Sequence, residues 1–226
     1  DANFTAHGRQ LQTFSVGYRD NRKYFHATKF QPGADAPYIR KMNEFLHARH
    51  HWITLDTPEL VPALYAAVDA RDLPGMADVD ASLLLFCRQI KPHATVALSG
   101  ECADEIFGGY AWYEDNPSVA KYKRMVPFGV RRALGKAAKH MPYFKGHNFL
   151  MKGAEMAEEY FVGQALVWPE REVSSVLRPE YDKGEGAFEL AAPIYARVSD
   201  KSELIRKQYL DMNMWLPGDI LLKADK

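Results

Sequence analysis

The sequence predicts an α/β fold in which helices cover a parallel sheet, followed by a mainly helical region. Two observations predict the sheet: short β-prone runs alternate with amphipathic segments, and turn residues separate them. A third predicts the helical region, because from about Ser118 strand signals fade and apolar residues recur at helical spacing. We therefore divide the chain into an α/β part at residues 1–116 and a helical part at residues 117–226.

The first half supplies strands and helices in alternation. Residues 11–17 and 52–55 are predicted strands, because both runs are short, rich in β-prone residues and bounded by polar or glycine positions. Between them, a segment opened by Pro37 carries apolar residues at helical spacing. After the second strand, Thr57 and Pro58 are expected to cap and to begin another helix.

A third helix and a third strand complete this half. Asp78 or Asp80 can cap the helix, and Pro92 is expected to end it. The run Ala94–Leu98 then predicts a strand buried on both faces, as in the middle of a parallel sheet.

Composition excludes several classes of protein. The chain of 226 residues is 47% hydrophobic, and Lys+Arg and Asp+Glu are both 29, so overall charge favours neither a nucleic acid nor an anionic membrane as partner. No stretch approaches the roughly 18 apolar residues of a membrane span. Cys87 and Cys102 are interpreted as free thiols in a reducing, cytoplasmic compartment. Because the chain does not begin with Met, we expect both ends to be cuts inside a longer protein.

The candidate site is the run from Val96 to Tyr110, which is predicted to form a strand, a tight turn and the start of a helix. In open α/β sheets ligands bind just beyond the carboxyl ends of the strands, where Ser99 and Gly100 stand. Gly100 lets the backbone come close to a ligand, and the free N–H groups of the helix start favour an anion.

Three carboxylates, Glu101, Asp104 and Glu105, crowd the same turn. Three carboxylates would repel an anionic ligand unless a cation lay between them, and a magnesium ion bound to a polyphosphate would fill that role. Glu101 and Asp104 are expected on one helix face, because they are three residues apart. Alternatively, the acidic residues only complement the helix dipole and Gly108–Gly109 caps the helix.

The run matches every fixed position of Ser-Gly-Glu-x-x-Asp-Glu-x-Phe-Gly-Gly-Tyr and so resembles the signature of the asparagine synthetase family. The residues at 13–17, 77–78 and 215–225 also resemble blocks of that family. The resemblance implies a Rossmann-like fold of the adenine nucleotide α-hydrolase type, also called PP-loop ATP pyrophosphatase. In that fold ATP lies across the carboxyl edge of a parallel sheet.

The implied activity is that of an amide-forming ligase of asparagine biosynthesis that uses ATP and Mg²⁺. Aspartate is adenylated to β-aspartyl-AMP with release of pyrophosphate. Ammonia from an N-terminal glutaminase (glutamine amidotransferase) domain of the same protein then displaces AMP and gives asparagine. Homodimers are common in the family.

The resemblance also assigns roles to individual residues. Val16 and Gly17 would contact adenine and ribose, Ser99 and Gly100 the adenosine part, and Asp104 the Mg²⁺ on the pyrophosphate. Glu101 is the catalytic candidate. Related β-lactam synthetases typically carry Tyr at its position, so its carboxylate favours transfer of an external amine over ring closure.

The sequence also departs from the family pattern. The phosphate loop Ser-Gly-Gly-x-Asp-Ser does not occur in it and is expected shortly before Asp1, with Ala2–His7 as the tail of the following helix. The glutaminase domain is not in the sequence either, so we predict that the fragment alone is inactive. Two alternatives stay open: a sister ligase acting on another carboxylate, and a non-catalytic nucleotide-binding homologue.

Two further groups of residues have simpler interpretations. His50 and His51 could bind a metal, but neighbours on a strand point to opposite faces, which favours a packing role. The basic stretch at residues 121–139 could bind RNA or a membrane surface, but a solvated helix face fits the zero net charge better.

Overall fold

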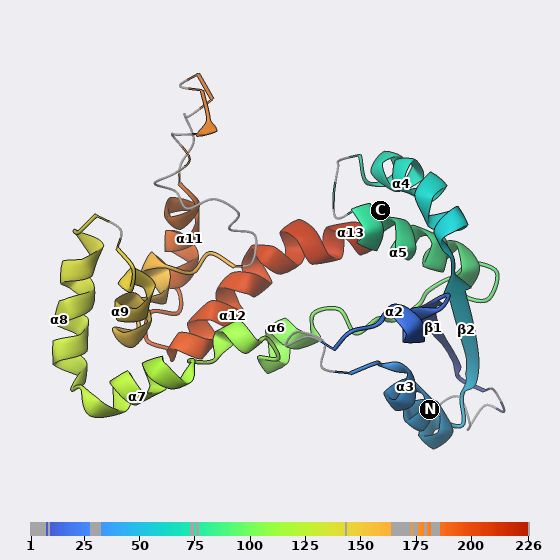
Figure 1. Ribbon diagram of the computed structural model, residues 1–226, viewed down its shortest axis with the longest axis horizontal. Coiled ribbons are helices and arrows are strands. Elements are labelled where there is room, and N and C mark those ends of the chain that lie inside the picture. Colours follow the sequence, from blue (N-terminus) through green and yellow to red (C-terminus); the bar gives the residue numbers. More distant parts are fainter. Residues whose placement is uncertain are drawn as a thin grey trace. The chain divides into compact units, whose positions relative to one another are not determined.

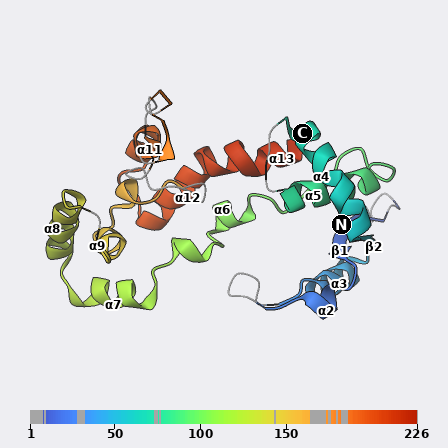
Figure 2. The same cartoon turned by 45° about the horizontal axis from the view of Figure 1, so that its top comes forward.

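The computed structural model describes residues 8, 10–27, 33–72, 75, 77–142, 144–163, 173, 176–178, 180–181 and 186–225. The chain forms two compact units, Asp1–Leu98 and Ser99–Asp225 (Figure 1, Figure 2). The predicted division between residues 116 and 117 stays a prediction. The predicted helix tail at 2–7 lies outside the described residues.

A two-stranded parallel sheet forms the first unit's framework. Strand β1 (Gln12–Tyr18) pairs with β2 (Arg49–Leu55) so that Gln12 lies opposite Arg49 and Tyr18 opposite Leu55. Parallel neighbours need a crossover connection, and here it contains α2 (Asn21–Tyr24) and α3 (Ala36–Leu46). The structure thus confirms two predicted strands, a parallel arrangement and the helix that follows Pro37.

Two longer helices, α4 (Thr57–Arg71) and α5 (Ala77–Ile90), follow the sheet. Their starts differ from the predicted caps. The carboxylate of Asp56 accepts the backbone N–H of Thr57 at 2.8 Å and caps α4 in place of Thr57. Helix α5 already begins at Ala77, so neither Asp78 nor Asp80 caps it. Asp80 instead accepts hydrogen bonds from Arg71 of α4 at 2.9 and 3.1 Å.

The core of this unit lies between α4 and α5. Ala63, Ala67 and Ala81 are buried there, and four leucines pack around them: Leu60, Leu64, Leu84 and Leu85. The small alanine side chains let the two helix backbones approach closely. The half-buried Arg71–Asp80 pair joins the same two helices.

The predicted third strand at Ala94–Leu98 is wrong. These residues form no strand, and the side chains expected to be buried are exposed: 78% of Val96 and 98% of Leu98 are accessible. A strand needs a hydrogen-bonded neighbour, and among the described residues β1 and β2 pair only with each other. The apolar composition of residues 94–98 favours burial, but composition alone cannot supply the neighbouring strand with which a β-strand forms hydrogen bonds.

The described residues of the second unit form helices joined by turns and contain no strand, which confirms the helical prediction for the chain after about Ser118. Its helices are α6 (Ala103–Phe107), η1 (Ala111–Tyr113), α7 (Pro117–Met125), α8 (Phe128–Lys139), α9 (His147–Gly153), η2 (Ala157–Glu159), α11 (Ala187–Ala196), α12 (Glu203–Asn213), η3 (Leu216–Ile220) and α13 (Leu221–Asp225). The segment η3 is π-helical. Across the described part of the chain, no helix combines the length and apolar character that crossing a bilayer requires.

Helix α12 is the central element of the second unit. It contacts α6, α11, η1 and η2, so residues far apart in the sequence meet on its surface (Figure 1). The main buried cluster around it consists of Tyr113, Ala157, Phe161, Val162, Ala191, Tyr195 and Leu210. A smaller buried cluster packs α8 against α9 through Ala138, Met151, Ala154 and Met156.

Candidate functional site

The signature run forms an exposed turn followed by the short helix α6. Ser99 and Gly100 are exposed, and the backbone N–H of Glu101 donates to the Ser99 hydroxyl at 3.4 Å. Cys102 has φ 74°, in the left-handed region, so the regular helix begins only at Ala103. Glu101 therefore precedes the helix, and the expectation that Glu101 and Asp104 share a helix face is wrong.

Glu101 meets a residue from the other end of the unit. The Lys223 ammonium lies 3.6 Å from a Glu101 carboxylate oxygen, and both side chains are partly accessible. Lys223 belongs to α13, within the family-like block at 215–225. The fold thus joins two sequence blocks that resemble the same family.

Asp104 lies exposed in the first turn of α6, where a carboxylate complements the helix dipole. Two glycines, Gly108 and Gly109, shape the chain at the end of α6 next to Asp104. Gly108 ends α6 at φ 70°, and Gly109 donates its N–H to the Asp104 carbonyl at 3.0 Å. A Cβ on Gly109 would lie 2.1 Å from a carboxylate oxygen of Asp104. The capping interpretation therefore holds for Gly108, and Gly109 leaves space for the Asp104 side chain.

Glu105, the third carboxylate of the turn, is fully buried and points away from the exposed surface. The Tyr110 hydroxyl donates to it at 2.7 Å. From α12, the Gln208 amide donates to the main-chain carbonyls of Glu105 and Ile106 at 2.8 and 3.0 Å. Ser99, Gly100 and Asp104 of the signature therefore lie on the surface, whereas Glu105, with its partner Tyr110, anchors the signature in the core.

A second buried carboxylate, Asp211, lies on α12 one helical turn beyond Gln208. The Tyr113 hydroxyl donates to it at 2.6 Å. Burial, with the nearby charge of Glu105, raises the pKa of Asp211 to about 6, although the Tyr113 hydrogen bond opposes the rise. Burial and the same Glu105 charge also raise the pKa of Tyr110.

Sequence reasoning missed Gln208, Asp211 and the pairing of Lys223. A signal for the first two exists: they are polar, three residues apart, and lie on either side of the apolar Leu210. That spacing indicates polar groups on the buried face of an amphipathic helix.

The predicted site residues fall into two sets. The structure places Ser99, Gly100, Glu101 and Asp104 together on the turn before α6 and in its first residues. The other two, Val16 and Gly17, are half-buried in β1 of the first unit.

The exposed turn suits a magnesium ion held largely by a ligand. Mg²⁺ usually binds one or two protein carboxylates and completes its octahedron with phosphate and water oxygens. Asp104 offers one exposed carboxylate, and no atom lies within 4 Å of the Cβ position of Gly100, so a phosphate could approach the backbone. Among the described side chains, no group of three or more metal-binding residues forms an all-protein cage.

The histidine pair packs as expected. His51 stacks on Phe14 at 4.8 Å between ring centroids and lies 4.6 Å from His93, whereas His50 contacts the Thr13 hydroxyl at 2.9 Å. Burial lowers the pKa of His50. The two imidazoles thus have separate neighbours, in agreement with their predicted packing role.

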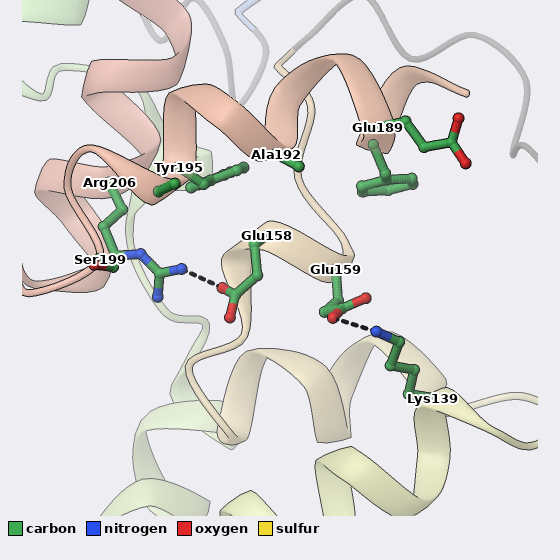
Figure 3. Close-up of a pocket in the computed structure, with 10 residues that line it drawn as sticks. Lys139, Glu158, Glu159, Glu189, Ala192, Tyr195, Ser199 and Arg206 are labelled. Carbon is green, nitrogen blue, oxygen red and sulfur yellow. Dashed lines mark hydrogen bonds and ion pairs between the residues drawn. The ribbon is translucent and has the colours of Figure 1, made fainter. Parts of the chain in front are cut away.

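A cavity of about 430 Å³ lies elsewhere in the second unit (Figure 3). Arg206 pairs with Glu158 there, and Lys139 pairs with Glu159 at 2.6 Å. None of the predicted site residues lines the cavity, and these four charges neutralise one another.

Comparison with known proteins agrees with the signature. Residues 2–226 match the asparagine synthase family, which is nearly the whole chain. The chain belongs to the asparagine synthase family. Its α/β architecture, with a small parallel sheet and many helices, accords with that membership. The match also includes the region between Ser118 and Ile194, where the sequence alone offered no recognisable block.

Two curated relatives illustrate the similarity within the asparagine synthase family. Asparagine synthetase [glutamine-hydrolyzing] 3 of Bacillus subtilis is 55% identical over 103 residues, or 46% of this chain and 17% of the relative. Asparagine synthetase [glutamine-hydrolyzing] 1 of the same organism is 35% identical over 153 residues, or 67% of this chain and 24% of the relative. The matched stretches are thus about a quarter of these relatives or less. No solved structure matches the chain significantly.

Proposed function

We propose that this chain is part of the synthetase domain of a glutamine-hydrolysing asparagine synthetase, an amide-forming ligase that uses ATP and Mg²⁺. Family membership and the signature run support the proposal. The observation that carries it is the Glu101–Lys223 pair at 3.6 Å. It joins the signature run to the family-like block at 215–225 and places a catalytic candidate on an accessible surface.

The proposed reaction has two steps. A carboxylate oxygen of aspartate attacks the α-phosphorus of ATP, the bond to pyrophosphate breaks, and β-aspartyl-AMP forms. The nitrogen of ammonia then attacks the activated carbonyl carbon, AMP leaves, and the nitrogen loses a proton. A glutaminase domain of the same protein supplies the ammonia, as the bracketed part of the relatives' names suggests.

The residues of the second unit take distinct roles in this scheme. Glu101 would accept the proton from the attacking nitrogen, a role that suits an accessible carboxylate. Asp104 would hold Mg²⁺, which supplies charge neutralisation on the phosphates when bound. Ser99 and Gly100 would contact the adenosine part through the hydroxyl and the backbone.

In the first unit, Val16 and Gly17 would contact adenine and ribose. The open surroundings of the Gly17 Cβ position, with no atom within 4 Å, are compatible with a flat ring lying against the strand. The same proposal assigns a cytoplasmic location, no nucleic acid partner, and a homodimeric assembly.

The test measures asparagine and pyrophosphate made by the full-length protein from ATP, Mg²⁺, aspartate and glutamine. An Asp104→Ala variant should lose both products. Asp200→Ala is the matched control, because it removes an exposed carboxylate of the same unit at the α11–α12 connection. Asparagine in equal amount to pyrophosphate, lost only in the Asp104 variant, supports the ligase and the metal role.

Two other outcomes would move the assignment. Pyrophosphate formed only with a different carboxylate acceptor would indicate a sister ligase. Absence of turnover in a protein with an intact phosphate loop would indicate a nucleotide-binding homologue without ligase activity.

A further inference from the structure

Helix α12 holds the signature loop at two points. The first is Gln208, whose amide nitrogen donates to the carbonyls of Glu105 and Ile106. The last carbonyls of a helix have no partner within it, so Gln208 satisfies main-chain acceptors near the end of the five-residue helix α6. This contact fixes α6 against α12 through its backbone, whatever side chains α6 carries.

The second point is Asp211, which accepts the Tyr113 hydroxyl at 2.6 Å. Tyr113 ends η1, which follows Gly108 and Gly109. Both residues of the Tyr113–Asp211 pair are buried, so water does not compete for this hydrogen bond. The loop between α6 and η1 is therefore tied to one helix on both sides.

The same helix leads directly to Lys223. After Asn213 the regular α-helix is interrupted by Met214 and by the π-helical segment η3, and α13 then carries Lys223 to within 3.6 Å of Glu101. Single π-helical turns often mark functional sites, because they change the side on which the following residues lie. The successive elements α12, η3 and α13, drawn in red in Figure 1, thus bring the chain back to the signature turn.

We propose that Gln208 and Asp211 are positioning residues of the site: by fixing α12 to the signature loop, they hold Glu101 and Lys223 in contact. This inference rests on the proposed function for its effect on catalysis. Whether α12 fixes the geometry of the exposed turn does not depend on which reaction the protein catalyses.

The chemistry of the two side chains supports a positioning role. Apolar residues would fill the same core without a desolvation cost, whereas each buried polar group must find a partner. Gln208 finds its partners in α6 and Asp211 in η1, although α12 also contacts α11 and η2. A directional hydrogen bond fixes register and orientation, which nonspecific apolar packing does less well.

The first experiment needs no activity. Hydrogen exchange is followed in the full-length protein by mass spectrometry of peptides covering residues 99–110 and 217–225. Gln208→Ala and Asp211→Ala should speed exchange in the 99–110 peptide by about tenfold or more, because each loses a buried hydrogen bond. Asn213→Ala is the matched control: this exposed amide on the same helix donates to the Tyr209 carbonyl of that helix, and exchange should stay unchanged.

The second experiment separates positioning from general damage. In the wild-type background, Gln208→Ala and Asp211→Ala should lower kcat by up to about 100-fold, because small displacements of reacting groups carry costs of that size. In a Glu101→Gln background the same changes should cost almost nothing further, since they act through Glu101. Asp211→Asn should restore most of kcat, because its carbonyl can still accept the Tyr113 hydroxyl.

Every outcome bears on the inference. Unchanged exchange in the 99–110 peptide would overturn it, and so would equal losses of kcat in the wild-type and Glu101→Gln backgrounds, which indicate general destabilisation. Faster exchange in a wild-type protein that makes no asparagine would retain the structural coupling and reject the proposed function instead.

Discussion

Asp211 makes the stability of the second unit depend on pH in an unusual direction. Its folded-state pKa of about 6 lies above its ordinary value of 3.8. The native state therefore keeps a proton that the unfolded chain has already lost between these values. Stability linked to Asp211 is then greatest at low pH and falls as pH rises through about 6. Between low and high pH, Asp211 changes the free energy of unfolding by about 3 kcal/mol in total, at about 1.4 kcal/mol per pKa unit.

The perturbation is Asp211→Asn, which removes the titration and leaves an acceptor for Tyr113. Between pH 4.5 and 7.5, wild type should lose about 2 kcal/mol of stability relative to the variant, since part of the linkage lies below that range. For a unit of this size the loss corresponds to roughly 7 °C in the difference between the two melting temperatures.

The assay records thermal unfolding of both full-length proteins by tryptophan fluorescence at several pH values. Only the difference between wild type and variant matters, because other titrating groups are common to both. Glu105→Gln provides a second arm. It removes the neighbouring charge that helps to raise the pKa of Asp211, so the pH-dependent loss should shrink. A difference that stays constant with pH, or that favours wild type at high pH, would refute the reasoning.

Three further changes have expected outcomes. Gly109→Ala should displace Asp104 and weaken Mg²⁺-dependent activity more than it lowers the melting temperature; the reverse order would contradict the crowding at 2.1 Å. Asp80→Ala removes the two hydrogen bonds that Arg71 of α4 donates to α5 and should cost about 1.5–3 kcal/mol in urea unfolding, because both side chains are largely shielded from water; a loss below 1 kcal/mol would contradict this reasoning. Gly135→Ala should cost about 1–3 kcal/mol in urea unfolding, because its Cβ would lie 2.4 Å from that of Ala154; an unchanged stability would contradict the overpacking of α8 against α9.

Local sequence signals predicted the elements that depend on local physics. Strands β1 and β2, the helix after Pro37 and the helical second unit follow from periodicity, β-propensity and proline positions. The cap of α4 was misplaced by one residue, because Asp56 and Thr57 can both cap a helix and only the three-dimensional contacts choose between them.

Features that depend on distant partners could not be predicted in the same way. The run Ala94–Leu98 has the composition of a buried strand, but its conformation depends on whether a neighbouring strand is present. At the site, the sequence predicted the turn at Ser99–Gly100, but it did not predict which side chains of the signature point into the core. Glu105 packs against α12, where Gln208, which donates to the Glu105 carbonyl, lies 103 residues further along the chain.

The two-stranded sheet has a consequence for handling the protein. Among the described residues β1 and β2 pair only with each other, so the outer edge of each strand exposes backbone groups that can pair with another chain. Val96 and Leu98, near the end of the same unit, also expose apolar side chains. A fragment limited to Asp1–Leu98 should therefore self-associate and express poorly. Fragments designed around the helical unit Ser99–Asp225 are the better starting material for biophysical work.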